Sequence, residues 1–118
     1  MDVDVIGGTL GPNSAQPVVV EATVTLLSER EGGKSRPITA PYRPNHNFGG
    51  PDNLVMYIGQ VDIPRGEWMR PGETRSLQIT FLNGPGLAEK LTPGTKWRLQ
   101  EGRRLIGTAE VIRLVRAA

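Results

Sequence analysis

Apolar and polar residues alternate along several short stretches of this chain, and this period of two restricts the fold more than any other feature. The cleanest example places Leu77, Ile79 and Phe81 between polar residues. Successive side chains of a β-strand point to opposite faces, so this stretch predicts a strand with one buried face. A similar pattern runs through residues 20–26 and 55–63. We therefore expect a chain built from strands.

Proline and glycine exclude long helices from most of the sequence. The 118 residues include 10 prolines and 15 glycines, and Pro37, Pro41 and Pro44 each lack a backbone hydrogen-bond donor. Residues 36–48 are consequently expected to be extended or looped. Residues 87–91 have room for a single helical turn.

The end of the chain predicts a β-hairpin. Residues 96–100 and 105–115 have strand patterns, and the short connection Glu101-Gly102-Arg103 lies between them. The side chains expected to face inward are Trp97 and Leu99, and those expected to face outward are Lys96, Arg98 and Gln100.

Six short strands with turn signals between them describe one all-β domain, either a closed antiparallel barrel or a small sandwich. We expect this domain to span residues 17–118. Residues 1–16 are expected to form a flexible leader, because they are rich in glycine and polar residues and offer few side chains to a core. The side chains expected inside the barrel are Val24, Leu77, Ile79, Phe81, Trp97 and Leu99.

Composition limits the chemistry that the chain can perform. It contains no cysteine, which excludes disulfides and thiolate metal sites, and its one histidine, His46, leaves little for a zinc site. No metal or other cofactor is therefore expected. The sequence has neither a signal-peptide pattern nor an apolar run near the roughly 20 residues that span a bilayer. These features predict a cytoplasmic protein without membrane contact.

Charge is distributed unevenly although the net charge is only +2. Residues 1–31 carry five acidic residues against Arg30 alone, a sum of −4, whereas residues 96–118 carry six basic residues against two acidic ones, a sum of +4. A cluster of positive charge attracts phosphate. A solvated sheet face produces the same count, so charge alone leaves both interpretations open.

Two local features could be taken for a nucleotide-binding loop and a catalytic histidine, but their surroundings in the sequence argue against both functions. Gly33-Lys34-Ser35 imitates the end of a phosphate-binding loop, yet Ser28 stands where that motif needs glycine, and the prolines that follow prevent the required helix. Glycines here are better explained by a turn with positive φ. His46 lacks an identifiable nucleophile or acid and is expected in a surface loop. We expect no nucleotide binding and no enzymatic activity.

Several turn motifs occur in a fixed order along the chain. The motifs are Leu27-Ser28, Glu31-Gly32-Gly33-Lys34, Pro37, Tyr42-Arg43-Pro44, Ile63-Pro64, Met69-Arg70-Pro71-Gly72-Glu73 and the stretch from Arg98 to Gly107. Their order resembles the third, C-terminal barrel domain of translation elongation factor Tu, which typically reads LS, EGGR, TP, GYRP, LPEG, MPGD and FAIREGGRTVG. The resemblance covers about residues 20–115 and implies a six-stranded antiparallel closed β-barrel.

The resemblance also implies a candidate RNA-binding edge. In the family, the residues aligned with Lys34, Asn45, Glu101 and Gly102 lie near the T-stem of aminoacyl-tRNA. The candidate RNA-binding residues of this chain are Lys34, Arg43, Asn45, Glu101, Gly102 and Arg103. Basic side chains neutralise phosphate, and amide or carboxylate groups can bond the 2′-hydroxyls of an A-form minor groove. The chain is therefore interpreted as a non-catalytic binding module that contacts tRNA or other structured RNA.

Two departures from the family pattern leave an alternative open. The segment around residues 44–53 is several residues longer than in the family and lacks its threonine-rich motif. The nucleotide-binding domain and the second barrel are not in this chain, so no GTPase activity is expected. The family's barrel also docks on proteins, and an interaction module that binds a protein without RNA is the alternative function.

Overall fold

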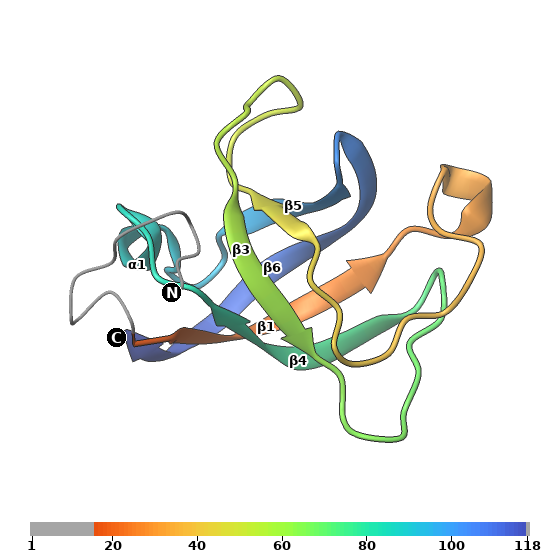
Figure 1. The fold of residues 1–118 in the computed structure, drawn as a ribbon, viewed down its shortest axis with the longest axis horizontal. Helices are drawn as coiled ribbons and strands as arrows, with labels where there is room; N and C mark the ends of the chain where they lie inside the picture. Colours follow the sequence, from red (N-terminus) through yellow and green to blue (C-terminus); the bar gives the residue numbers. More distant parts are fainter. Residues whose placement is uncertain (1–15, 118) are drawn as a thin grey trace, which may run out of the picture.

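Six antiparallel strands close into a barrel in the computed structural model, which describes residues 16–117 (Figure 1). The six-stranded antiparallel barrel predicted from the sequence is confirmed. The order around the barrel is β1-β4-β3-β2-β5-β6. The strands are β1 (Val18–Leu26), β2 (Asn45–Asn47), β3 (Tyr57–Asp62), β4 (Thr74–Phe81), β5 (Lys96–Glu101) and β6 (Arg104–Ala117). The leader predicted for residues 1–16 lies outside the described residues, apart from Gln16.

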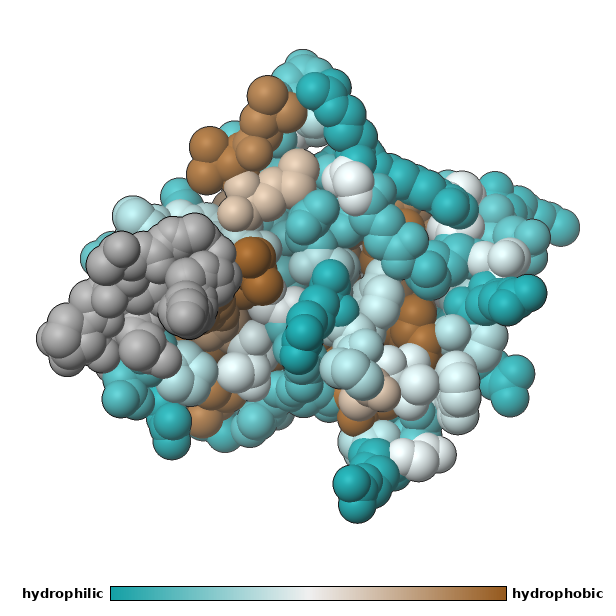
Figure 2. Space-filling view, viewed as in Figure 1, coloured by the Kyte–Doolittle hydropathy of each residue, from teal (hydrophilic) through white to brown (hydrophobic). Residues whose placement is uncertain are grey.

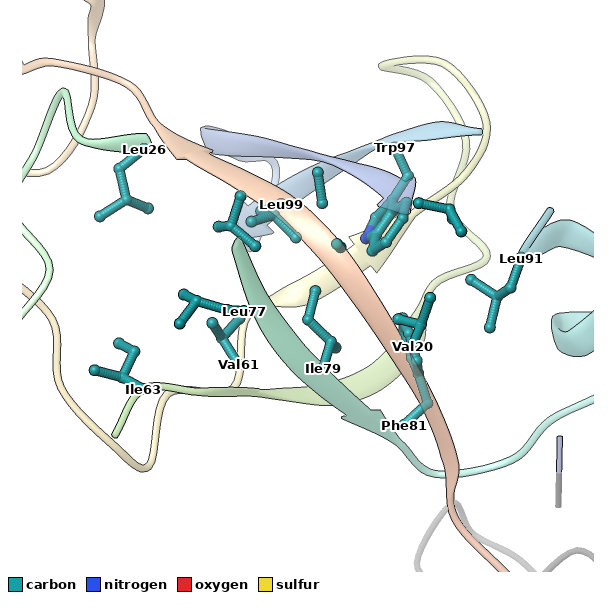
Figure 3. Packing of buried hydrophobic residues seen from close by; sticks show 14 of the residues in the cluster. Val20, Leu26, Val61, Ile63, Leu77, Ile79, Phe81, Leu91, Trp97 and Leu99 are labelled. Atoms are coloured by element: carbon teal, nitrogen blue, oxygen red, sulfur yellow. The ribbon is translucent and has the colours of Figure 1, made fainter. Parts of the chain in front are cut away.

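The alternation seen in the sequence accounts for the core. Every second residue of β1 is buried, and the buried residues of β4 and β5 face them (Figure 3). Each such aliphatic or aromatic side chain contributes on the order of 1.5–3 kcal/mol when it leaves water. All six side chains predicted to face inward are buried, namely Val24, Leu77, Ile79, Phe81, Trp97 and Leu99.

The helical content is as small as the prolines and glycines imply. A 3-10 turn, η1 (Glu29–Glu31), follows β1, and a single α-helical turn, α1 (Leu87–Lys90), precedes β5. Within residues 16–117 no helix is long and apolar enough to cross a bilayer. Gly32, directly after η1, has the positive φ of 96° that a turn needs. Gly33 is required for another reason, since a Cβ there would lie 2.2 Å from the backbone oxygen of Leu27.

The prediction that His46 lies in a surface loop is wrong. His46 belongs to β2, pairs with Leu99 of β5 and is fully buried beside Phe81, with 4.7 Å between their ring centroids. A strand of three residues is too short to reveal its alternation in the sequence. The three prolines before it made the whole segment resemble a loop.

The expectation that Gln100 faces solvent is also wrong, because Gln100 is buried. The pairing of β5 with β6 shifts register between Leu99 and Gln100. The Gln100 amide accepts from Asn47 Nδ2 at 2.8 Å and from Arg98 Nε at 2.8 Å, and it donates to the Gly102 oxygen at 3.0 Å. These bonds satisfy a polar side chain that strand alternation alone would place in water.

Candidate functional site

An ion pair joins two distant segments at the end of the barrel where β1 ends and β6 begins. Lys34 Nζ lies 2.7 Å from Glu101 Oε2, although the residues are 67 positions apart. The Tyr42 hydroxyl donates to the same oxygen, also at 2.7 Å. The Lys34 ammonium also lies 5.8 Å from the centroid of the Tyr42 ring. Two donors thus hold the Glu101 carboxylate. We call this end of the barrel the basic end; its residues are Lys34, Arg36, Glu101, Gly102, Arg103 and Arg104.

The turn after β1 brings Lys34 to this position. Ser28 caps η1, because its hydroxyl accepts from the Glu31 backbone N–H while the Glu31 carboxylate accepts from the Ser28 backbone. These bonds to Ser28 hold the pKa of Glu31 below its usual value. Gly32 then reverses the chain, and the close approach of Gly33 to Leu27 directs Lys34 toward β5.

The contacts of Glu101 and Tyr42 set their protonation states. Partial burial acts to raise the pKa of Glu101, but the hydrogen bonds from Lys34 and Tyr42 and the charges of Lys34 and Arg104 outweigh it, so the pKa lies below its usual value. Burial, together with the bond to the negative Glu101, raises the pKa of Tyr42. At neutral pH the site therefore holds a carboxylate and a neutral phenol.

Arg104 borders a hollow at the basic end. Its Nη2 donates to the Gly33 oxygen at 2.6 Å and to the Gly32 oxygen at 3.3 Å. The adjoining hollow has a volume of about 400 Å³. The residues that line it are Glu29, Gly32, Gly33, Lys34, Ser35, Arg36 and Arg104. Three cations against one carboxylate make this hollow suitable for an anion.

Two further arginines at the basic end are available to a ligand. Arg36 and Arg103 are exposed, and neither forms an ion pair with another residue of the described part of the chain. Gly102 has φ of 62°, which lets the β5–β6 turn project Arg103 outward. At the basic end, Lys34 and Arg104 are held by other groups of the protein, whereas Arg36 and Arg103 form no ion pair within the described residues.

The structure brings together most of the candidate residues named from the sequence. Lys34, Glu101, Gly102 and Arg103 lie at the basic end, and Asn45 pairs with Gln100, the residue beside Glu101. Arg43 does not join them. Its Nε donates to Gln60 Oε1 at 3.3 Å, and it borders a separate hollow of about 300 Å³ beside β3 and β4.

Sequence reasoning missed three members of the site as site residues: Tyr42, Arg36 and Arg104. Tyr42 and Arg104 both lie inside the turn motifs, which is the signal that could have identified them. Arg36 belongs to none of these motifs, although it directly precedes Pro37. Arg36 joins the site because the fold brings η1 and the start of β6 to the same hollow.

His46 is a structural residue. Its Nδ1 accepts from Trp97 Nε1 at 3.0 Å, so the imidazole Nε2 carries the proton that it donates to the Gly59 oxygen at 2.9 Å. Burial lowers the pKa of His46 to about 4. Among residues 16–117, no cluster of three or more His, Asp or Glu side chains is placed to hold a metal ion.

No model of a known protein family matches this chain.

Proposed function

We propose that this protein is a non-catalytic binding module of translation-factor ancestry that contacts tRNA or another structured RNA through the basic end, in the cytoplasm. The observation that carries the proposal is the gathering of Lys34, Arg36 and Arg104 around one hollow. The exposed Arg103 precedes Arg104 in the same turn. Phosphates supply most of the affinity in protein–nucleic acid contacts, and arginine and lysine are the side chains that bind them.

Neighbouring polar groups suit an RNA ligand in particular. The ionised Glu101 carboxylate can accept from a 2′-hydroxyl, and so can the amide of Asn45, whose backbone pairs with Gln100, the neighbour of Glu101. The 2′-hydroxyls line the wide minor groove of A-form RNA, where such short side chains can reach them. An edge with both cations and hydrogen-bonding groups therefore favours RNA over DNA.

The binding is expected to be weak and sensitive to salt. Lys34 is already paired with Glu101, and Arg104 is held by backbone oxygens, so only part of the positive charge is free. If four cations meet phosphates, the logarithm of the binding constant falls against the logarithm of salt concentration with a slope of roughly −3 to −4.

The experiment is a fluorescence-anisotropy titration of labelled tRNA at about 50 mM salt, where electrostatic contacts are little screened. Lys34→Ala combined with Arg103→Glu is expected to weaken binding at least tenfold. Arg65→Glu is the matched control, because Arg65 is an exposed arginine in the loop between β3 and β4. Absence of tRNA binding by the wild-type chain, or an unchanged affinity of the double variant, would refute the proposal.

A second candidate is a protein-interaction module, favoured by the loop between β2 and β3. Leu54 and Val55 in this loop are each 69% exposed, and Figure 2 shows apolar surface there. Hydrogen bonds of Asn47 and Asn53 hold the loop in one conformation. If this candidate is correct, Leu54→Ser with Val55→Ser abolishes capture of a protein partner from cell extract while tRNA affinity stays unchanged.

A further inference from the structure

The last part of β6 has an open edge. Pairing of β6 with β5 ends at Glu110 opposite Lys96, and Val111 makes the final bonds on that side, with Gly94 and Thr95. On the other side, pairing with β1 continues to Ala117. Within the described residues, 112–117 therefore have a strand partner on one side only.

The turn before β5 explains why this edge is open. Gly94 adopts φ of 89° in the Pro93-Gly94 turn, and the segment that enters β5 from α1 pairs with β6 no further than Val111. β6 has 14 residues, whereas β5 has six. The open stretch is about 20 Å long at the usual rise of a strand. An edge of that length can accept another strand.

Two aliphatic side chains project outward from this stretch. The register of β1 with β6 shifts between Val19 and Val20 and again between Glu21 and Ala22, which leaves Val115 and Ile112 without a partner in β1. Their side chains are 40% and 39% exposed. Bulges of this kind redirect side chains, and here they place two β-branched residues in solvent.

Charge identifies the chemistry that would complement this edge. Residues 112–117 include Arg113 and Arg116 and no acidic residue. Arg113 is ion-paired with Glu21 at 2.9 Å, whereas the exposed Arg116 forms no ion pair among the residues the structure describes. An extended segment that alternates acidic and aliphatic residues would match both the charge and the exposed Ile112 and Val115.

We propose that the open edge of β6, residues 112–117, binds an extended acidic and aliphatic peptide segment of a partner protein by adding it as a further strand. Backbone hydrogen bonds supply the affinity, and the two aliphatic side chains and Arg116 select the segment. β6 starts with Arg104 at the basic end and finishes at the opposite end of the barrel (Figure 1). This interaction is thus separate from the proposed RNA contact.

The test uses the full chain and a fluorescein-labelled ten-residue peptide of alternating aspartate and valine, measured by fluorescence anisotropy. We expect saturable binding, and we expect amides of residues 112–117 to gain protection from hydrogen exchange when the peptide is bound. The same peptide with every second amide N-methylated loses half its donors and is expected not to bind. Equal binding of the N-methylated peptide would show that strand addition is wrong.

Two variants test the residues that are proposed to select the peptide. Ile112→Thr with Val115→Thr keeps the preference for strand while removing apolar surface, and Arg116→Glu reverses the charge. Each is expected to weaken peptide binding about tenfold or more. The matched controls are Ile58→Thr, at an aliphatic residue that is 45% exposed, and Arg65→Glu; both are expected to stay within twofold of wild type. Unchanged affinity in both edge variants would overturn the proposal.

A chain that lacks residues 1–15 tests whether the segment that occupies the edge belongs to a partner protein or to this chain itself. If the edge serves a partner, the truncated chain binds the peptide within about twofold of the full chain. A rise of tenfold or more in affinity would show that the chain's own residues compete for the edge, and the partner proposal would be wrong.

Discussion

At the residue scale, the central feature of this barrel is one buried histidine. His46 lies among Phe81, Trp97 and Leu99, and both of its ring nitrogens are hydrogen-bonded. Such a group is compatible with the core only while it is neutral, because a proton on Nδ1 would remove the acceptor for Trp97 Nε1 and place a charge in apolar surroundings. The stability of the fold is therefore linked to pH through this residue.

The free energy of unfolding is expected to fall as pH drops from about 6.5 toward 4. The folded-state pKa of His46 is about 4, below the ordinary value of 6.5, so the unfolded chain binds a proton first. The stabilisation is complete above pH 6.5 and declines by up to about 1.4 kcal/mol per pH unit below it. Urea unfolding between pH 7 and 4.5 measures the slope. His46→Gln should lack it, and an equal slope in that variant would assign the effect to other groups.

Two adjacent glycines are expected to respond differently to substitution. Gly33→Ala places a Cβ 2.2 Å from the Leu27 oxygen and should cost about 2–3 kcal/mol of stability. Gly32→Ala meets no atom within 4 Å but keeps φ of 96°, and should cost about 1–2 kcal/mol. Gly50→Ala is the control, with open space and no positive φ. Thermal unfolding ranks the three, and a Gly33 variant as stable as the Gly50 variant would contradict the close approach.

At the element scale, the short strand β2 depends on a buried amide. Asn47 is fully buried and donates to Gly50 O at 3.0 Å and to Gln100 Oε1 at 2.8 Å. Its Oδ1 accepts from Gly49 N and Asn53 Nδ2, each at 2.8 Å. One side chain thus ties β2, β5 and the β2–β3 loop together. This explains how three residues suffice for a strand that closes the barrel.

Asn47→Ala is expected to destabilise the protein by about 2–3 kcal/mol, because buried partners lose their hydrogen bonds. Asn53→Ala removes contacts nearer the surface and should cost about 1 kcal/mol. Chemical denaturation measures both. Amide hydrogen exchange should also speed up at Gly49 in each variant. If Asn47→Ala proved no more harmful than Asn53→Ala, the buried amide would not be what secures β2.

At the scale of the whole molecule, β6 connects two proposed sites, which we expect to bind independently. It starts at the basic end and finishes at the open edge of a closed barrel. Coupling between them would require two conformations of the barrel that both ligands bias. The affinity for tRNA is therefore expected to stay within about twofold when the aspartate–valine peptide is saturating. Anisotropy titrations with and without peptide measure this. A change of fivefold or more would reveal a coupled transition of the barrel.

Local alternation was sufficient to predict β1, β3, β4, β5, β6 and the inward side chains, but not β2. Proline and glycine predicted the absence of long helices. Alternation succeeds in β1 and β4 because a strand with one buried face records its burial in every second residue, as with Leu77 and Ile79. Motif order placed Lys34 and Glu101 in one candidate edge. The proposals about RNA and protein partners are predictions that remain to be measured.

The tertiary structure alone decided which polar residues are buried and which charges meet. His46 and Gln100 are buried because β2 pairs with a strand some fifty residues away and its Asn47 bonds the Gln100 amide, neither of which leaves a local pattern. The contact of Arg104 with Gly33, the hollow it borders and the open edge of β6 likewise depend on strand lengths and pairings across the barrel. The alternation of apolar and polar residues indicates which residues of a strand are buried, because burial of one face acts on every second residue. Contacts between distant segments form only when the barrel closes.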